Sequence, residues 1–339
     1  MAFRSGFVSI IGRPNAGKST LLNALVGEKL AIVTHKPQTT RTRILGVVEA
    51  PTRAKEKGQP GRPPAQIVLV DTPGVHKAQT ALDKRMMQEV YDALESRDLV
   101  LFIVDATHKL HTAGGNAHAR SRVEKSSAED EYVLEIVKRL DCPVILLLNK
   151  TDAVPAAELL PLIAHWSALH EFAEVIPISA KKKRGLDVLL DKIVARLPEG
   201  ERYFPKDQVT DQPERFMAAE IVREKILMLT GEEVPYATAV VVESFEEADA
   251  SAKKPVTRIA AVIYCERTGQ KAILIGKQGA MLKQIGTSAR VELETLLGTK
   301  VFLELFVKVK DDWRGQRGFV DELDWRRQIE GLAGKLGRE

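Results

Sequence analysis

The chain has 339 residues, which is too long for one ordinary domain and favours two. Its 44% hydrophobic and 28% charged residues are typical of a protein that buries real cores, and its net charge of +4 is too small to indicate nucleic-acid binding by itself. Its two cysteines, Cys142 and Cys265, lie far apart in the sequence, which excludes a disulfide framework and favours a reducing compartment.

Five nearly continuous apolar runs alternate with amphipathic helical stretches over the first 200 residues. Strands that are buried on both faces have this pattern, so we expect a mostly parallel sheet with helices on both faces. Two stretches interrupt the pattern. The Pro-, Gly- and Lys-rich residues 51–64 indicate a hairpin tip, and residues 111–130 indicate a surface loop running into a helix. The expected strands are residues 7–11, 67–70, 99–104, 144–148 and 175–178.

Residues 12–19, with the sequence GRPNAGKS, follow the first strand and precede a helix expected over residues 20–26. They match G-x-x-x-x-G-K-[ST], and the strand and helix on either side are the context that this pattern requires. Its glycines let backbone N–H groups turn toward a β-phosphate. We expect Lys18 to contact the β- and γ-phosphates and the Ser19 hydroxyl to bind Mg²⁺. The nucleotide-binding residues expected here are Gly12, Arg13, Pro14, Asn15, Ala16, Gly17, Lys18, Ser19 and Thr20.

A second motif, Asp71-Thr72-Pro73-Gly74, ends the next expected strand. A carboxylate at this position can hold the Mg²⁺ shell. The Gly74 N–H can meet the γ-phosphate, so that its position can differ between the triphosphate and diphosphate states. We therefore expect Asp71 to be a metal ligand, and Asp71, Thr72, Pro73, Gly74 and Val75 to line the nucleotide site.

The last two motifs indicate which base is bound. Asn149-Lys150-Thr151-Asp152 follows the most apolar strand, and Asp152 can accept hydrogen bonds from guanine N1 and N2, which adenine cannot supply. Ser179-Ala180-Lys181 can offer a backbone N–H to guanine O6. All four motifs fall at strand ends, where open α/β sheets bind ligands, and predict an α/β P-loop GTPase domain that binds GTP and GDP. The base-binding residues expected are Asn149, Lys150, Asp152, Ser179, Ala180 and Lys181.

The pattern changes after an amphipathic helix at residues 185–196. We expect the first domain over residues 1–200, a linker over 201–212, a second domain over 213–315 and a tail over 316–339. The expected order helix–strand–strand–helix–helix–strand predicts an α+β fold for the second domain. Its expected elements are residues 213–229, 237–243, 257–266, 270–275, 280–297 and 301–309.

Gly276-Lys277-Gln278-Gly279 is a G-x-x-G loop between two helices, and in this element order it predicts a type II KH domain. Its glycines allow a sugar-phosphate backbone to approach the main chain. Residues 267–290 contain five basic side chains and no acidic one, and apolar residues 273, 275, 281, 282 and 285 can form a groove wall. The alternative is a solvated charged helix face. The RNA-binding residues expected are Lys271, Gly276, Lys277, Gln278, Gly279, Lys283 and Arg290.

Together these motifs resemble those of the Era family of bacterial GTPases, over about residues 5–320. The resemblance departs in the insertions at 51–64 and 111–128, and it fades after Gly315, so that residues 316–339 inherit nothing specific. The residues that carry it are 12–15 (GRPN), 36–41 (KPQTTR), 71–76 (DTPGVH), 149–152 (NKTD), 215–225 (RFMAAEIVREK) and 303–310 (LELFVKVK).

The resemblance implies two further metal contacts. Thr40 would bind Mg²⁺ through its hydroxyl when the γ-phosphate is present, with Thr39 as the alternative. Asn15 would mark a K⁺ site beside the phosphates, completed by oxygens of Thr34, Lys36 and Thr39. An equally plain alternative is that Asn15 only hydrogen-bonds the switch loop.

Val75 stands where Ras-like enzymes carry the glutamine that orients the attacking water. An apolar side chain cannot do this, and the sequence identifies no arginine finger. We therefore expect a catalytic set built on Lys18 and Thr40, with Mg²⁺, backbone dipoles and, where the Asn15 site holds it, K⁺, and we expect slow intrinsic hydrolysis.

The resemblance also implies the partners. They are the 3′ end of 16S rRNA and the small (30S) ribosomal subunit, whose assembly the protein would assist, as a monomer and without binding DNA. A tRNA-modification GTPase is the first alternative, but it would carry a cofactor-binding domain and a reactive C-terminal cysteine. A membrane-associated signalling GTPase is the second, but it would need a lipidation motif or a basic amphipathic anchor.

The N-terminus lacks the regions of a signal peptide, and the longest apolar run, residues 143–148, is far shorter than the ~20 residues that span a bilayer. We therefore expect a cytoplasmic protein that does not cross the membrane. Peripheral contact with the inner face of the cell membrane stays compatible with the sequence.

Overall fold

The computed structural model describes the chain except residues 1, 56–60, 108–127, 250, 252–253 and 329–339. The chain divides into two compact units. The first consists of Met1–Ala31, Thr40–Lys77 and Met86–Asp211, and the second of Ile32–Thr39, Ala78–Arg85 and Gln212–Glu339.

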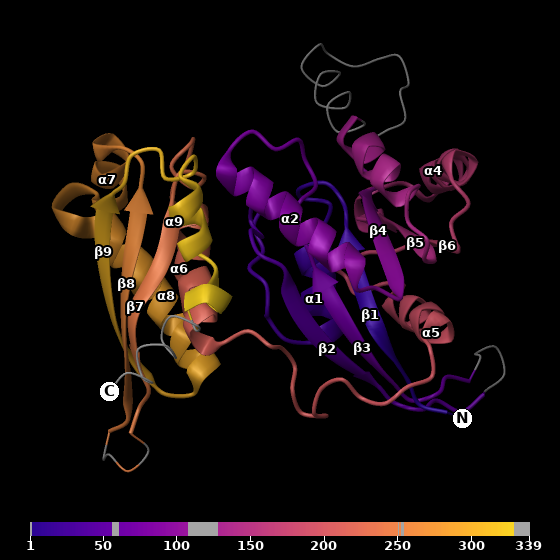
Figure 1. Cartoon of the computed structure of the whole chain (residues 1–339). Helices are drawn as coiled ribbons and strands as arrows, with labels where there is room; N and C mark the ends of the chain where they lie inside the picture. Colours follow the sequence, from indigo (N-terminus) through magenta and orange to yellow (C-terminus); the bar gives the residue numbers. More distant parts are fainter. Residues whose placement is uncertain (1, 56–60, 108–127, 250, 252–253, 329–339) are drawn as a thin grey trace. The chain divides into compact units, whose positions relative to one another are not determined.

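The first unit is built on a six-stranded sheet with the order β2-β3-β1-β4-β5-β6 (Figure 1). All neighbours pair in parallel except β2, which is antiparallel to β3. Every residue of β3, β4 and β5 is buried, as expected for strands covered on both faces. The strands are β1 (Arg4–Ile11), β2 (Ile44–Ala50), β3 (Ala65–Asp71), β4 (Leu99–Asp105), β5 (Val144–Asn149) and β6 (Glu174–Pro177).

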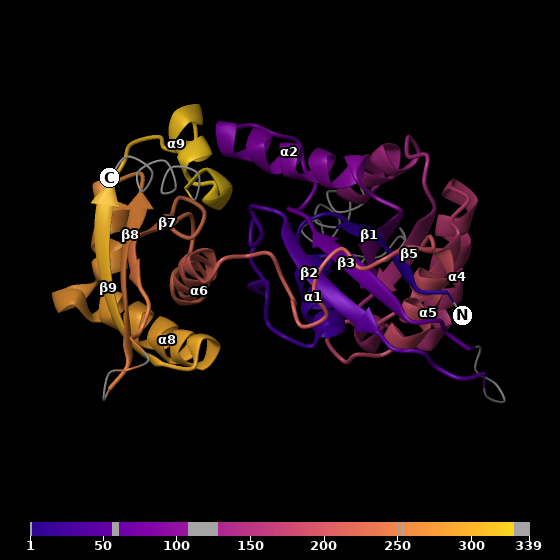
Figure 2. The ribbon, with the colours of Figure 1, turned by 60° about the horizontal axis from the view of Figure 1, so that its bottom comes forward.

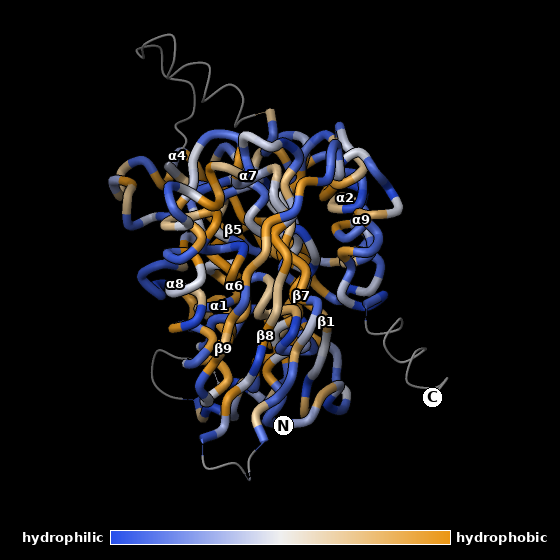
Figure 3. The backbone as a smooth tube through the Cα atoms, turned by 90° about the vertical axis from the view of Figure 1, so that its left-hand side faces the viewer, coloured by the Kyte–Doolittle hydropathy of each residue, from blue (hydrophilic) through white to orange (hydrophobic). Residues whose placement is uncertain are grey.

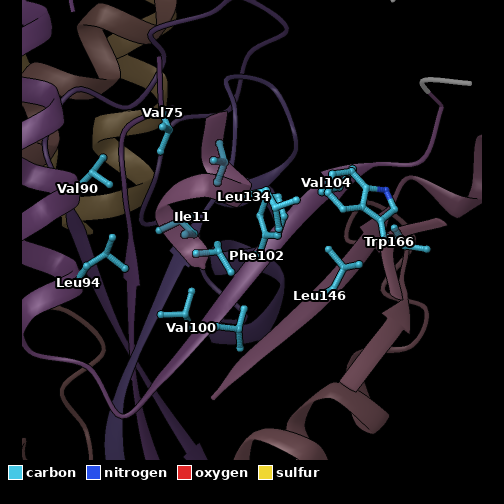
Figure 4. Packing of buried hydrophobic residues seen from close by; sticks show 14 of the residues in the cluster. Ile11, Val75, Val90, Leu94, Val100, Phe102, Val104, Leu134, Leu146 and Trp166 are labelled. Atoms are coloured by element: carbon cyan, nitrogen blue, oxygen red, sulfur yellow. The ribbon is translucent and has the colours of Figure 1, made fainter. Parts of the chain in front are cut away.

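Helices cover this sheet, which confirms the predicted fold class. On one face Phe102 of β4 packs edge-on against Trp166, with ring centroids 5.6 Å apart, inside a core shared by three helices (Figure 4). Those helices are α2 (Ala81–Glu95), a helix over residues 128–137 and α4 (Ala156–Leu169). The other helices of the unit are α1 (Lys18–Val26) and α5 (Leu186–Arg196), with a 3-10 turn, η1 (Thr151–Ala153).

The two insertions are described only in part. Arg53 and Arg62 exchange two backbone hydrogen bonds of 2.9 Å, so the arms that flank residues 56–60 form an antiparallel ribbon. Both guanidiniums are held by the carboxylate of Asp191. Most of the expected loop over residues 111–130 lies outside the described residues, and residues 128–137 are helical.

Most of the expected linker is bound along the first sheet. The buried Gln66 side chain accepts hydrogen bonds from the backbone N–H groups of Tyr203 and Phe204 and donates one to the Phe204 carbonyl. Val47 N–H donates to Val209 O, and the Thr210 hydroxyl donates to Leu45 O. The expected linker therefore belongs to the first unit as far as Asp211.

The second unit has a three-stranded sheet with the order β7-β8-β9, in which β8 and β9 are parallel (Figure 2). The three helices between Glu214 and Leu297 pack on one face over a core that includes Ile263, Leu274 and Ile285. This is the predicted helix–strand–strand–helix–helix–strand order. The elements are α6 (Glu214–Leu229), β7 (Ala239–Glu246), β8 (Val256–Cys265), α7 (Thr268–Ile275), η2 (Lys277–Gly279), α8 (Ala280–Leu297) and β9 (Lys300–Val309).

A short helix, α9 (Arg317–Glu322), lies in the segment expected to be a tail. Its Phe319 packs edge-on against Tyr264, with centroids 5.0 Å apart, and against the fully buried Trp313. The Trp313 Nε1–H donates to Ala237 O over 2.8 Å, so this indole packs inside the domain.

In both units the strands are rich in hydrophobic residues (Figure 3). Among the described helices none is long and apolar enough to cross a bilayer.

Candidate nucleotide and RNA sites

The phosphate loop connects β1 to α1 in an unusual backbone conformation. Asn15 and Gly17 have φ of 62° and 107°, in the left-handed region. A Cβ at Gly17 would lie 2.2 Å from Nδ2 of Asn149, and one at Gly12 would lie 2.5 Å from the carbonyl oxygen of Ile103. Both glycines are therefore required by the close approach of neighbouring strand ends, and the conformation lets N–H groups of the loop turn toward a phosphate.

Lys18 is buried at the start of α1. Its Nζ donates to the carbonyl oxygens of Gly12 and Arg13, each over 3.1 Å. Burial lowers the pKa of Lys18 from 10.5 to about 8, although the nearby carboxylate of Asp71 acts in the opposite direction. A cation held this way lacks a full counter-charge, which a nucleotide phosphate would supply.

This buried charge should cost stability in the nucleotide-free protein. The pKa of Lys18 is lower in the folded than in the unfolded protein, so the unfolded chain binds more protons between pH 8 and 10.5. The contribution of Lys18 to the free energy of unfolding of the wild-type protein therefore rises with pH across this window. Lys18→Met should remove this pH-dependent contribution. It should stabilise the protein by about 1–3 kcal/mol below pH 8, after loss of the bonds to two carbonyls, and by progressively less toward pH 10.5.

Urea unfolding of both proteins without nucleotide, at pH 7 and pH 10, measures this difference. A gain that does not depend on pH would contradict the assigned burial of the charge. Lys18→Met should at the same time lose measurable binding of GDP.

Three oxygen-bearing side chains meet beside Lys18. The Ser19 hydroxyl donates to Asp71 Oδ2 over 2.6 Å and lies 2.8 Å from the Thr40 hydroxyl, which is 3.4 Å from the same carboxylate oxygen. Burial raises the pKa of Asp71 to about 6. Its other oxygen, Oδ1, is buried and has no hydrogen-bond partner among the described residues. Two hydroxyls and an under-coordinated carboxylate are ligands that suit Mg²⁺, which keeps several waters and takes few protein ligands.

The residues considered for a K⁺ site are divided between the units. Asn15 belongs to the first unit, whereas Thr34, Lys36 and Thr39 belong to the second. The Thr39 hydroxyl donates to the Lys36 carbonyl over 2.6 Å and lies 2.8 Å from the Thr34 hydroxyl. The Lys36 amine donates to the carbonyls of Leu227 and Thr230 at the end of α6. Thr39 is therefore engaged within its own turn, while Thr40 reaches Ser19 and Asp71.

The base-recognition motifs are joined through Asn149. Its Nδ2 donates to Ala16 O over 2.8 Å, and its Oδ1 accepts from Ala180 N–H over 3.0 Å. The exposed Asp152 accepts a 2.6 Å hydrogen bond from the buried Ser179 hydroxyl, which lowers the pKa of Asp152. Asp152 is therefore ionised at neutral pH, with its orientation held by Ser179.

Val75 is fully buried in the core beneath the site, and its N–H donates to the Gly12 carbonyl over 3.1 Å. Its side chain packs with Ile11 and Val90 (Figure 4). Of the other expected residues, Pro14 lies close to Gly74, where an added Cβ would be 2.6 Å from the proline ring. The Asp71–Gly74 segment thus closes directly on the phosphate loop.

The sequence did not single out Asp105 and Asp130. Both are buried beside the phosphate loop, where they form ion pairs with the Arg13 guanidinium. Asp105 ends β4 in the same way that Asp71 ends β3, so a polar residue at the end of an otherwise apolar strand was the signal available.

The G-x-x-G loop has the backbone that favours glycine at its ends. Gly276 and Gly279 have φ of 71° and 80°, and a Cβ at Gly276 would lie 2.7 Å from the Met281 Cβ. Lys277 and Gln278 between them are exposed, as are Lys283 and Arg290, and Lys271 is half-buried. The loop therefore presents a main chain open to close approach, flanked by cations.

The expectation that Ile285 forms part of the groove wall was wrong. Ile285 is fully buried and packs in the domain core, because it follows the inward face of α8 with Ala289 and Leu293. Ile273, by contrast, is 49% exposed, and Ile275, Met281 and Leu282 are half-buried beside the loop.

Comparison with known proteins finds a family match in each of the two units. Residues 7–150 match the family described as 50S ribosome-binding GTPase, and residues 233–314 match the KH domain. GTPase Era of Syntrophus aciditrophicus is 47% identical over 311 residues, which are 92% of this chain and 92% of the relative. GTPase Era of Geobacter metallireducens is 46% identical over 95% of this chain and 98% of its own.

Two solved structures are similar over nearly the whole length. One is a variant of Aquifex aeolicus Era bound to GDP·AlF4⁻, and the other is Era in complex with MgGDPNP and nucleotides 1506–1542 of 16S ribosomal RNA. Each has a TM-score of 0.81 and 41% identity, and each comparison covers 94% of this chain and 98% of the other.

Proposed function

This chain belongs to the Era family of GTPases, and we propose that it couples its nucleotide state to the binding of the 3′ end of 16S rRNA during assembly of the small ribosomal subunit. The observation that carries the proposal is the Gly276–Gly279 loop, whose left-handed glycines and exposed Lys277 suit a nucleic-acid backbone. A relative that is 41% identical binds nucleotides 1506–1542 of this RNA.

We assign the phosphate-binding role to the main chain of residues 12–19 and to Lys18. Ser19, Thr40 and Asp71 would hold Mg²⁺, which would supply positive charge to offset the charge that develops on the transferring phosphoryl group. The close contact among their oxygens supports this set, and the engaged Thr39 hydroxyl favours Thr40 over Thr39. Asp152, held by Ser179, would select guanine, with the Ala180 backbone beside it.

Hydrolysis would depend on positioning and charge alone. The buried Val75 side chain cannot orient a water, so Lys18 and the loop's N–H groups would stabilise the transferring phosphoryl group. Intrinsic turnover would be slow, as suits a switch. We also propose that the protein acts as a monomer in the cytoplasm, with the 30S subunit as partner and without binding DNA.

A K⁺ ion beside Asn15 would supply additional positive charge at the phosphates. If it does, single-turnover GTP hydrolysis should be faster in KCl than in NaCl of equal ionic strength, and Asn15→Ala should remove the difference. Equal rates of the wild-type protein in the two salts would exclude K⁺ and leave Asn15 as a hydrogen-bonding residue of the loop.

The RNA assignment is tested by fluorescence anisotropy with a labelled oligonucleotide of the 16S rRNA 3′ end. A scrambled RNA of the same composition and a DNA of the same sequence serve as controls. The 16S sequence should bind more tightly than both, and its affinity should differ between the GDP state and the state with a non-hydrolysable GTP analogue. Equal affinity for the scrambled RNA would contradict the assigned target.

A further inference from the structure

Four charged side chains meet at the carboxyl end of β4, below the phosphate loop. The Arg13 Nε donates to Asp130 Oδ2 over 3.1 Å, and its Nη2 lies 3.4 Å from Asp105 Oδ2. The Lys150 amine donates to the same Asp105 oxygen over 2.6 Å. Both aspartates and Arg13 are less than a tenth exposed, and all four residues belong to the first unit.

Asp105 is held in one orientation. Its second oxygen, Oδ1, accepts hydrogen bonds from the Thr107 N–H over 3.0 Å and from the Thr107 hydroxyl over 2.7 Å. The carboxylate therefore turns one oxygen to its own chain segment and the other to two cations. Those cations come from separate motifs, since Arg13 is in the phosphate loop and Lys150 is in the base-recognition segment.

Buried charges are costly, and an apolar cluster of similar volume is often at least as stable. The position of this cluster gives it a use besides stability. The carbonyl oxygens of Gly12 and Arg13 hold the Lys18 amine, so fixing the Arg13 side chain also fixes the main chain that positions Lys18. Lys150 has φ of 64°, and the ion pair with Asp105 holds the side chain of this strained residue.

We propose that Asp105 is a positioning residue of the nucleotide site, which ties the phosphate loop through Arg13 to the base-recognition segment through Lys150. The inference rests on the nucleotide site assigned above. The two halves of the site are held at a set separation before the nucleotide arrives, so that less ordering is needed on binding. Asp105 thereby acts on the affinity for GDP and GTP alike, and not on base choice.

Asp105→Asn should therefore raise the Kd for GDP and for GTP by a similar factor, roughly 10- to 100-fold. The rate of hydrolysis at saturating GTP should fall by a smaller factor, because the bound phosphates then help to hold Lys18, so that the effect falls mainly on KM. Thr107→Ala keeps every charge but removes one hydrogen bond to Asp105, and it should give a smaller rise in Kd. This second variant serves if Asp105→Asn does not fold.

A double-mutant cycle separates positioning from general stability. In protein that already carries Arg13→Gln, Asp105→Asn should cost less affinity than it does in the wild type. Asp191→Asn is the matched control, because Asp191 also bridges two arginines in the first unit, and among the described residues its ion pairs are with Arg53 and Arg62, which lie outside the nucleotide motifs. It should lower the Tm of the nucleotide-free protein without changing the Kd for GDP.

Titration with fluorescent GDP and GTP analogues, beside thermal melting, measures the wild-type protein and each variant. The proposal would be overturned if Asp105→Asn bound GDP with the wild-type Kd, or if Asp191→Asn raised the Kd as much as Asp105→Asn does. It would also be overturned if the effects of Asp105→Asn and Arg13→Gln on the Kd were fully additive. Failure of the wild-type protein to bind either nucleotide would instead overturn the nucleotide site itself.

Discussion

Asp152→Asn should shift the preference of the nucleotide site from guanine toward xanthine. The ionised carboxylate can accept from N1–H and from the 2-amino group of guanine, whereas an amide can accept from N1–H and donate to the 2-carbonyl of xanthine. Ser179 holds the side chain at this position through its 2.6 Å hydrogen bond, and it can bond to an amide oxygen as well. The ratio of the affinity for GTP to the affinity for XTP should fall by roughly 100-fold or more. The variant loses the charge-assisted hydrogen bonds to guanine and gains a hydrogen bond to the 2-carbonyl of xanthine.

Competition of GTP, XTP and ATP against a fluorescent guanine nucleotide measures the shift. Asp141→Asn is a suitable control, since Asp141 is an exposed carboxylate of the same unit whose ion pair is with Arg97. If Asp152→Asn keeps the wild-type margin for GTP, then Asp152 does not select the base.

Replacing Lys277 and Gln278 together by Asp should abolish binding to a short single-stranded RNA, with a loss of roughly 100-fold or more. Two carboxylates would stand where the phosphate backbone passes, and one cation would be lost. The fold should tolerate the change because both side chains are exposed, and because the left-handed conformation of Gln278, with φ of 53°, is one that Asp adopts more readily than most residues.

Basal GTP hydrolysis should survive in this double variant, since Lys18 and the metal ligands belong to the first unit. Any stimulation of hydrolysis by RNA should be lost with the binding. Lys206→Asp, an exposed substitution in the first unit, controls for most of the change in overall charge, since it lowers the net charge by two where the double variant lowers it by three. Full RNA affinity in the double variant, on protein shown to be folded by its melting temperature, would mean that residues 276–279 form only a structural turn.

The parts that the sequence predicted best are those that depend on local pattern. Buried strands are continuous apolar runs, and ligands bind where parallel strands end. The motifs at residues 71–74 and 149–152 could therefore be located from the ends of the expected strands. The G-x-x-G loop was equally local, because its glycines are required by the backbone of two successive turns.

The parts that the sequence missed depend on contacts between distant residues. Gln66 holds residues 203 and 204 along the sheet, but an amide in a strand does not reveal which backbone groups it will meet 137 residues later. Asp105 and Asp130 belong to no motif, and only their burial beside Arg13 distinguishes them from surface acids. For Ile285 the sequence indicated an apolar helix face, but only packing decides which residues on it are covered.

The most direct test of the proposed RNA target is to crosslink the protein to RNA in cells and to sequence the bound RNA. We expect 16S rRNA to be recovered, with crosslinks concentrated at its 3′ end, and we expect the Lys277→Asp/Gln278→Asp protein to lose them. Recovery of tRNA or mRNA in place of 16S rRNA, with crosslinks that the double change leaves intact, would contradict it.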